Sequence, residues 1–269
     1  MIHDPKRRTI TAVPFRDRVV HHALLAPLQP IFERRMIDDS HACRPGKGTS
    51  SAMRRAEKFV RRHHYALKLD VRAFFDSLRH ADVLSTLGRL VKDRRVLGLC
   101  ETILGTGGRG LPIGSLTSQW FANMALDPLD HFVKEELRIP GYLRYMDDFA
   151  LFADDKRTLS DAHAEVAGWL ATHLDLSLKR RATRLAPTTE GLHFLGFTIR
   201  PGSVRLRPDN LRRFRWRLRW LRRELAHGRI GEDRYVRAVA AVFEHIRPAD
   251  TLALRRRLST DLEGSTEIL

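Results

Sequence analysis

Apolar and polar residues alternate along this chain with two different periods. Steps of three and four between apolar positions predict helices over residues 16–32, 51–62, 116–136, 159–173, 210–223, 232–245 and 251–262. Alternation predicts a strand over residues 65–71, and short apolar runs predict strands over 142–145, 149–153 and 192–199. Strands separated by helices, with two strands adjacent in a hairpin, predict an α+β fold in which helices back a split βαβ sheet.

The length of 269 residues suits one large domain or two modest ones, at about 150 residues each. An Arg-Pro-Gly-Ser sequence at residues 200–203 interrupts the pattern, and helical periodicity follows it. We therefore expect residues 201–269 to form a small helical unit.

The charge balance points to a polyanionic partner. Lys and Arg number 48 against 32 Asp and Glu, which gives a formal net charge of +16. Seven arginines fall within residues 210–223, in a predicted helix that also carries Trp216 and Trp220. No apolar run approaches the roughly 18 residues that span a bilayer, so nucleic acid is favoured over a membrane. The two cysteines form no CxxC pair, which favours a reducing cytoplasm.

Three carboxylates occupy positions that suggest metal chemistry. Asp70 ends an apolar strand, and Asp147 and Asp148 form the turn between two apolar runs. Adjacent like charges in a tight turn repel each other, and a divalent cation would cancel that cost. Mg²⁺ takes oxygen ligands from one or two carboxylates and completes its shell with substrate phosphates. The structural alternative for an isolated Asp-Asp pair is a hydrated turn.

The surrounding motifs resemble those of reverse transcriptases. Residues 145–148 (YMDD) resemble the YxDD signature, and residues 67–76 (LKLDVRAFFD) resemble the acidic motif that precedes it. Residues 110–119 resemble the nucleotide-pocket motif, and residues 193–197 resemble the hairpin that grips the primer end. Two fingers elements of group II intron-type enzymes match residues 14–20 and 40–48. Together these six motifs form an ordered series over about residues 3–200.

The resemblance implies the fold of a right-hand polymerase, with fingers, a split βαβ palm and a basic, helical thumb. It places the fingers at residues 1–66 and 79–116, the palm at 67–78 and 117–200, and the thumb at 201–269.

The resemblance also implies synthesis of cDNA on an RNA template by two Mg²⁺ ions, for which Mn²⁺ can substitute. Asp70, Asp147 and Asp148 are then the catalytic carboxylates, and with Val71 they form the metal site. The nucleotide-binding residues implied by the matching motifs are Arg8, Arg18, Arg72, Ala73, Phe74, Phe75, Ile113 and Gly114. Phe75 falls where an aromatic gate excludes a ribose 2′-OH, which implies dNTP as the substrate, and Lys179 falls where a lysine can protonate the departing pyrophosphate.

Further contacts are expected with the template RNA and the cDNA or primer. The primer-grip residues implied by the resemblance are Phe194, Leu195 and Gly196. The nucleic-acid contacts expected from the basic loop and the arginine-rich helix are Arg44, Lys47, Arg212, Arg215 and Arg219.

Two positions in the nucleotide-pocket motif resemble the reverse transcriptases of diversity-generating retroelements. Most family members carry Gln before the motif's Gly and end it in Ser-Pro, whereas this chain has Ile113-Gly114 and ends in Ser118-Gln119. That subfamily implies error-prone copying at template adenines and a small basic accessory protein. A group II-like or phage-defence reverse transcriptase shares every carboxylate and remains an alternative. An inactive RNA-binding scaffold or splicing helper is the alternative of another class.

Other titratable pairs are expected to be structural. Asp154-Asp155 also follows an aromatic residue, but it precedes a predicted helix, where an acidic residue caps free N–H groups. His21-His22 and His63-His64 lack a third ligand at useful spacing, and we expect them on the surface.

Overall fold

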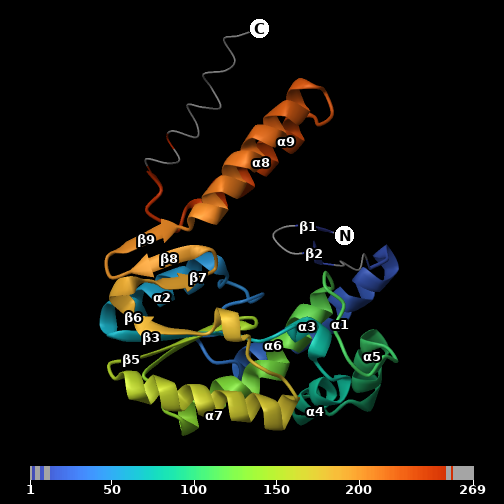
Figure 1. Ribbon diagram of the computed structural model, residues 1–269. Coiled ribbons are helices and arrows are strands. Elements are labelled where there is room, and N and C mark those ends of the chain that lie inside the picture. The colour runs from blue at the N-terminus through green and yellow to red at the C-terminus, as the bar shows by residue number, and fades with distance from the viewer. Residues whose placement is uncertain (1, 4–6, 9–12, 253–255, 257–269) are drawn as a thin grey trace. The chain divides into compact units, whose positions relative to one another are not determined.

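The computed structural model describes residues 2–3, 7–8, 13–252 and 256, with side chains from residue 13 onward (Figure 1). The chain divides into two compact units. Unit 1 comprises residues 1–52 and 65–185, and unit 2 comprises residues 53–64 and 186–269.

A four-stranded sheet carries the predicted acidic residues. Its strands are β3 (Tyr65–Asp70), β4 (Gly141–Tyr145), β5 (Asp148–Ala153) and β6 (Arg184–Pro187), and their order is β4-β5-β3-β6. β5 pairs antiparallel with both β4 and β3. With helices between β3 and β4 and between β5 and β6, this is the order of a split βαβ sheet, which confirms the predicted palm topology.

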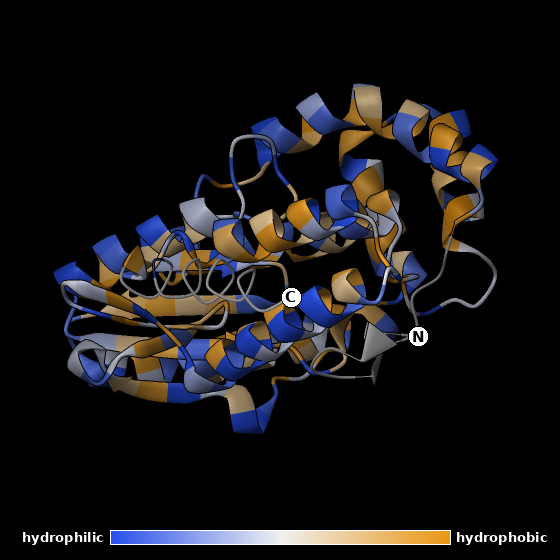
Figure 2. Ribbon diagram, turned by 90° about the horizontal axis from the view of Figure 1, so that it is seen from above, coloured by the Kyte–Doolittle hydropathy of each residue, from blue (hydrophilic) through white to orange (hydrophobic). Residues whose placement is uncertain are grey.

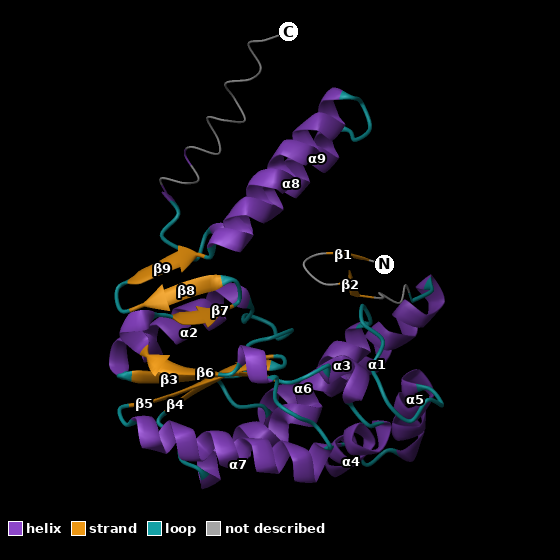
Figure 3. Ribbon diagram, viewed as in Figure 1, coloured by secondary structure: helices purple, strands orange, loops and turns teal. Residues whose placement is uncertain are grey.

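Helices of unit 1 enclose the apolar core of the sheet (Figure 3). α7 packs against β3 and β5, and α6 packs against α7. Every residue of α6 from Trp120 to Leu126 is buried, so this helix lies inside the unit. The helices are α1 (Phe15–Arg35), α3 (Phe74–Ser77), α4 (His80–Leu90), α5 (Arg94–Leu104), α6 (Leu116–His131), which a π-helical turn (Phe132–Glu136) extends, and α7 (Lys156–Leu174). Short strands β1 (Ile2–His3) and β2 (Arg7–Arg8) and a 3-10 turn (Arg180–Ala182) complete the unit.

Unit 2 contains a three-stranded antiparallel sheet and a pair of long helices. The sheet has the order β7-β8-β9, and α8 packs against α9 through Leu218, Val242 and Ile246. Apolar and polar segments alternate along these helical ribbons and those of unit 1 (Figure 2). The elements are β7 (Leu192–Phe194), β8 (Phe197–Arg200), β9 (Ser203–Leu206), α8 (Pro208–Ala226), α9 (Glu232–Ile246) and a 3-10 turn (Thr188–Glu190), together with most of α2 (Thr49–Arg62).

Two predicted elements are corrected in unit 2. The apolar run at residues 192–199 is not one strand, because Leu195 and Gly196 adopt positive φ and turn the chain between β7 and β8. Residues 203–206 form a strand, so the Pro-Gly sequence before them is a hairpin turn and the helices begin only at Pro208. The helix predicted over residues 251–262 lies outside the described residues, apart from residues 251, 252 and 256.

Among the described residues, no helix combines the length and the apolar character needed to cross a membrane.

Candidate active site at the ends of β3 and β5

Two of the predicted carboxylates face each other across neighbouring strands. Asp70, the last residue of β3, is the register partner of Asp148, the first residue of β5. Directly opposed residues project to the same face of a sheet, so the two carboxylates lie side by side at its end. Each is partly open to solvent, with 21% of the Asp70 side chain and 23% of the Asp148 side chain exposed. Opposed like charges destabilise a strand pair, so this arrangement needs compensating positive charge.

Two lysines supply part of that compensation. Lys68 lies two residues before Asp70 and is thus the diagonal neighbour of Asp148, and its Nζ is 2.8 Å from Asp148 Oδ1. Lys179 follows α7, and its Nζ is 3.4 Å from Asp70 Oδ2. The Lys179 backbone N–H also donates to the Asp70 carbonyl at 2.8 Å. That main-chain bond fixes the lysine beside the strand end.

The charge compensation at Asp148 is incomplete. Burial raises the pKa of Asp148 to about 6, and the nearby charges of Asp70 and Asp147 add to that increase, while Lys68 opposes it. Asp70 and Asp147 therefore both act electrostatically on Asp148 at this end of the sheet. A further cation here would relieve their repulsion.

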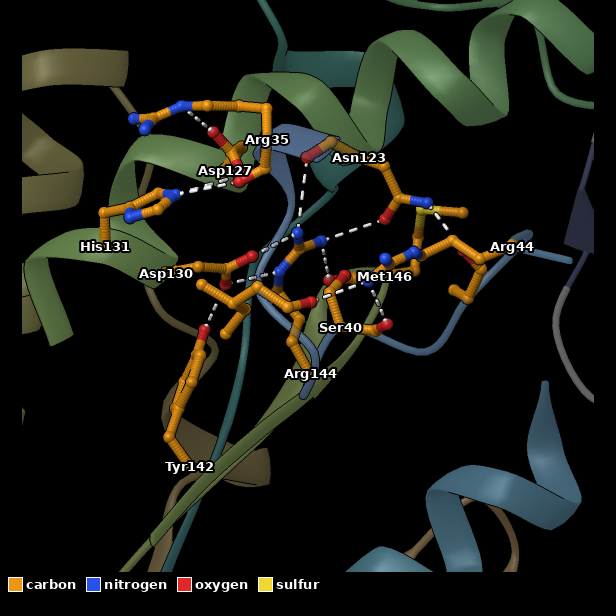
Figure 4. A network of polar contacts seen from close by, with 12 residues as sticks. Arg35, Ser40, Arg44, Asn123, Asp127, Asp130, His131, Tyr142, Arg144 and Met146 are labelled. Atoms are coloured by element: carbon orange, nitrogen blue, oxygen red, sulfur yellow. Dashed lines mark hydrogen bonds and ion pairs between the residues drawn. The ribbon is translucent and has the colours of Figure 1, made fainter. Parts of the chain in front are cut away.

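The third carboxylate belongs to the tight turn between β4 and β5. Met146 in this turn has φ of 58°, in the left-handed region that costs a non-glycine residue free energy. The Asp147 carbonyl accepts a hydrogen bond of 3.2 Å from the Val71 N–H, which ties the turn to the end of β3. From the other side, Arg144 donates to the Met146 carbonyl at 3.2 Å (Figure 4).

The donor set at this site fits Mg²⁺. In the ranges that the structure describes, no three His, Cys, Asp or Glu side chains form a group that could hold a metal ion by themselves. Mg²⁺ does not require such a group, because it typically binds one or two protein carboxylates and takes water and substrate phosphates for its other positions. Asp70 and Asp148, opposed at the strand ends with incomplete charge compensation, supply two such carboxylates.

The segment predicted to contact the incoming nucleotide follows Asp70 directly. Arg72 and Ala73 are exposed, and Ala73 has φ of 45° at the start of α3. Phe74 is buried, whereas Phe75 is half-buried and meets the Phe74 ring edge-on at 5.6 Å. The Phe75 side chain thus packs on Phe74 and stays partly open to solvent, and its role as a gate stays a prediction.

The nucleotide-pocket motif lies against the same helix. The Leu111 N–H donates to the Phe75 carbonyl at 2.7 Å, which brings the segment before Ile113 beside the predicted gate. Ile113 is half-buried, and Gly114 is exposed with φ of 107°.

α1 reaches this motif through a buried histidine. His21 Nδ1 lies 3.0 Å from the hydroxyl of Ser115, and Arg18 is exposed one turn earlier on the same helix. Arg8 belongs to β2, but its side chain lies outside the described residues. The surface position predicted for His21 and His63 is wrong, since their exposed fractions are 8% and 5%.

Two predicted RNA-binding residues of unit 1 are engaged within the protein. The guanidinium of Arg44 donates to the Glu33 carboxylate and to the carbonyls of Ile37 and Ser40, and its side chain is only 5% exposed. Lys47 pairs with the Asp38 carboxylate. These bonds organise the loop after α1, and contacts of Arg44 and Lys47 with RNA stay a prediction.

Unit 2 carries the predicted primer grip and the arginine-rich helix. Phe194 is buried at the end of β7, and Leu195 and Gly196 form the turn to β8. On α8, the predicted nucleic-acid contacts Arg212, Arg215 and Arg219 are all exposed.

Comparison with known proteins identifies the family. Residues 3–199 match the family model described as reverse transcriptase (RNA-dependent DNA polymerase). The chain belongs to the reverse transcriptase family. Its YMDD turn and the Asp70 strand end lie within the matched range.

Curated relatives of this reverse transcriptase include intron-encoded proteins. The chain is 39% identical over 90 residues to nuclear intron maturase 1, mitochondrial, of Arabidopsis thaliana, a match that covers 34% of this chain and 13% of the maturase. It is 22% identical over 241 residues to protein YkfC of Escherichia coli, covering 72% and 63% of the two chains. It is 25% identical over 138 residues to the group II intron-encoded protein LtrA of Lactococcus lactis, covering 48% and 23%. The chain thus spans less than two thirds of the length of each of these relatives.

Solved structures show the same fold. The telomerase from Candida tropicalis in complex with the TWJ fragment of telomeric RNA superposes with a TM-score of 0.59 at 12% identity, covering 89% of this chain and 48% of that one. The telomerase from Candida albicans, also with a TWJ fragment, gives a TM-score of 0.54 at 13% identity, covering 70% and 37%. The predicted fold class, α+β of the reverse transcriptase type, is confirmed.

Asp155, in the second acidic pair of this reverse transcriptase, caps a helix, as predicted. Asp155 caps α7, where its carboxylate accepts hydrogen bonds from the Thr158 N–H at 2.8 Å and the Thr158 hydroxyl at 3.0 Å, and these bonds lower the pKa of Asp155.

Two basic residues near the carboxylates, Lys68 and Arg144, were not predicted from the sequence. Their signal was present, because each is the only basic residue within a largely apolar strand, a position that requires a paired partner.

Proposed function

We propose that this protein is an RNA-directed DNA polymerase that extends a primer on a template RNA. The observation that carries the proposal is the Asp70–Asp148 register pair at the strand ends, beside the Asp147 turn, in a chain of the reverse transcriptase family. Nucleotidyl transfer asks little covalent chemistry of a protein, because positioning and charge neutralisation dominate phosphoryl transfer. Carboxylates fixed at the ends of rigid strands provide that positioning.

Asp70, Asp147 and Asp148 would hold two Mg²⁺ ions in this proposal, with Val71 at the edge of the site, and Mn²⁺ could substitute. When bound, the ions activate the attacking primer oxygen and stabilise the leaving one. Lys179, already within 3.4 Å of Asp70, holds a proton on Nζ that it can pass to the departing pyrophosphate. Lys68 keeps Asp148 oriented toward the sheet end.

Further residues make the other substrate contacts in this proposal. Arg8, Arg18, Ile113, Gly114 and the backbone of residues 72–74 bind the incoming nucleotide. Phe75 excludes a ribose 2′-OH, so dNTP is the substrate. Phe194, Leu195 and Gly196 grip the primer. The exposed arginines of α8 bind the phosphates of the template–primer backbone, and the net charge of +16 attracts this polyanion to the protein.

We further propose that the enzyme copies with low fidelity at template adenines, as part of a diversity-generating retroelement. The support is the Ile113-Gly114 and Ser118-Gln119 pattern, together with the half-buried position of Ile113 next to the Phe75 segment. A structured template RNA and a small basic accessory protein are the partners that this role implies. The intron-encoded relatives favour a group II-like enzyme as the second candidate, and a phage-defence role has the same chemistry.

Primer extension by the purified protein on a defined RNA template tests the proposed activity. We expect a DNA product complementary to the template, made from dNTPs in Mg²⁺ or Mn²⁺. We expect rNTPs to be incorporated at least about tenfold less efficiently, because the clash of their 2′-OH with Phe75 costs roughly 1.4 kcal/mol or more. A protein that binds the primer–template and makes no product in either metal would instead be an RNA-binding scaffold or splicing helper.

A further inference from the structure

Arg144 is a charged residue at the centre of unit 1. It lies in β4, two residues before the YMDD methionine, and its side chain is 0% exposed. Asp130 of α6, its ion-pair partner, is 0% exposed as well. Burial alone would lower the pKa of Arg144. The charge and hydrogen bonds of Asp130 raise that pKa by more than burial lowers it, so the guanidinium is charged.

The guanidinium finds an acceptor for each of its five N–H groups (Figure 4). Nε and Nη2 donate to the two oxygens of Asp130 at 2.7 and 2.6 Å. Nη1 donates to the side-chain oxygen of Asn123 at 2.9 Å, and Nη2 also donates to the Asn123 carbonyl at 3.3 Å. The remaining Nη1 donor reaches the Met146 carbonyl at 3.2 Å.

The partners of Arg144 are themselves fixed. The Tyr142 hydroxyl donates to Asp130 at 2.6 Å, and the Asn123 amide donates to the Ala42 carbonyl at 2.8 Å. The Arg144 main chain joins the same assembly, because its N–H donates to the Asp39 carbonyl and its carbonyl accepts from the His41 N–H. The guanidinium therefore has one position relative to α6, to β4 and to the loop after α1.

Stability does not account for this arrangement. A buried ion pair loses solvation on both charges, and apolar residues of similar volume commonly replace such a pair without loss of stability. What apolar residues cannot supply is a directed N–H donor to the Met146 carbonyl. That carbonyl belongs to a residue with φ of 58°, directly before Asp147, in a turn with no glycine to relieve the backbone strain.

We propose that Arg144 is a positioning residue for the catalytic turn. Held by Asp130 and Asn123, it fixes the Met146 carbonyl and so sets where Asp147 and Asp148 enter the site. Val71 holds the turn from the other side through the Asp147 carbonyl. The inference deepens the proposed polymerase function and rests on it for its effect on catalysis.

The test uses a variant that removes both buried charges together, Arg144→Met with Asp130→Leu, so that neither charge is left unpaired. Three quantities are measured on the full chain: the thermal unfolding midpoint, hydrogen exchange of the amides in residues 145–149, and kcat and KM for dNTP. We expect a folded protein whose turn amides exchange about tenfold faster, the effect of one missing hydrogen bond. We expect kcat to fall about tenfold or more while KM changes less than about threefold, since the nucleotide contacts remain.

Thr86→Val is the matched control, because it removes the hydrogen bond from the hydroxyl of the buried residue Thr86 to the Asp82 carbonyl in α4, outside the Arg144 network. It should leave turn exchange and kcat within about twofold of wild type. If the double variant unfolds, Arg144→Lys replaces it in the test. This variant keeps a positive charge opposite Asp130 but loses the planar guanidinium with its several N–H donors, and faster exchange of the turn amides is again expected.

A folded double variant, or a folded Arg144→Lys variant, with unchanged exchange over residues 145–149 would overturn the proposal and make the network a packing feature only. Hydrogen exchange needs no substrate. A wild-type protein without RNA-templated synthesis would therefore contradict the polymerase function, while the exchange result still decides whether Arg144 positions the turn.

Discussion

Single residues set the charge balance at this site and, in the proposed function, its fidelity. Lys68 and Lys179 lie within 4 Å of the two facing carboxylates, one from the same strand as Asp70 and one from a loop about 110 residues later. Their placement lets the sheet keep two opposed carboxylates at the point where β3 and β5 end. Ile113 has a different role in the proposed function, because it lies on the nucleotide side and carries no polar group.

Ile113→Gln tests the proposed low fidelity. A glutamine at this position can hydrogen-bond in the correct base-pair geometry, where isoleucine makes only apolar contact. Such a bond is worth about 1 to 3 kcal/mol, or roughly 5- to 150-fold in discrimination. We expect sequenced wild-type cDNA to carry errors concentrated opposite template adenine, and the Gln variant to reduce them. Ile113→Leu, which stays apolar, is the control and should leave the error spectrum unchanged.

Uniform, low error at all four template bases in the wild-type product would contradict the retroelement role. The group II-like or defence enzyme would then be the better description of the same active site.

At the residue scale, the sequence indicates which charged residues end or interrupt apolar strands, but not which contacts they make. Asp70, Asp147 and Asp148 could be found because each ends or interrupts an apolar strand. The partners of Arg144 could not, since Asn123 and Asp130 lie on a helix whose arrangement depends on tertiary packing. Likewise, nothing in the local sequence shows that Arg44 turns inward to Glu33.

Among the structural elements, the β7–β8 hairpin depends on glycine more than the β8–β9 hairpin does. Gly196 has φ of 88°, and a side chain there would collide with Asn210, whose amide donates to the Gly196 carbonyl at 3.0 Å. Gly202 has a similar φ of 81°, but no atom lies within 4 Å of the place where its Cβ would be. A side chain at Gly202 would therefore add backbone strain alone, whereas a side chain at Gly196 would add both backbone strain and a collision with Asn210.

Gly196→Ala should therefore destabilise the protein more than Gly202→Ala. Left-handed strain costs either variant about 1 to 2 kcal/mol. Displacing Asn210 adds about 1 kcal/mol for Gly196→Ala, because its hydrogen bond to the turn is broken. Denaturant unfolding of the two variants side by side measures the difference, and equal losses of stability would show that Asn210 does not hold this turn.

The α8 helix presents its arginines to solvent, and this predicts a specific salt dependence. Replacing Arg215 and Arg219 by Gln should weaken primer–template binding evenly across sequences. The slope of log affinity against log salt should fall by roughly one unit for each phosphate that the variant no longer neutralises. Arg94→Gln with Arg95→Gln, exposed on α5, serves as the charge-matched control. An unchanged slope in a folded Arg215/Arg219 variant would point to a protein partner on this face of α8.

At the scale of the whole chain, the alternation of strands and helices, with one hairpin, predicted the split βαβ sheet, although its fourth strand, β6, was not among the predicted strands. Helical periodicity, by contrast, predicted a helical unit directly after residue 200. It did not indicate β9, because a strand of four residues is too short for its alternation to be recognised. Its pairing with β8 is a local hairpin whose turn is Pro201-Gly202, a signal that we interpreted as a boundary before helices. The limits of fingers, palm and thumb stay a prediction.

The central claim for the whole molecule is that the protein performs RNA-templated DNA synthesis and needs the carboxylates at the β4–β5 turn for catalysis. Asp147→Asn tests it most directly, because a neutral amide cannot compensate a divalent ion, whereas affinity for RNA comes from dispersed Lys and Arg contacts. Asp154→Asn, an exposed position in the second acidic pair, is the control. In primer extension with Mg²⁺, we predict no product from Asp147→Asn at nearly unchanged RNA binding, and full product from Asp154→Asn. Substantial extension by Asp147→Asn would contradict the proposed catalytic role of this turn.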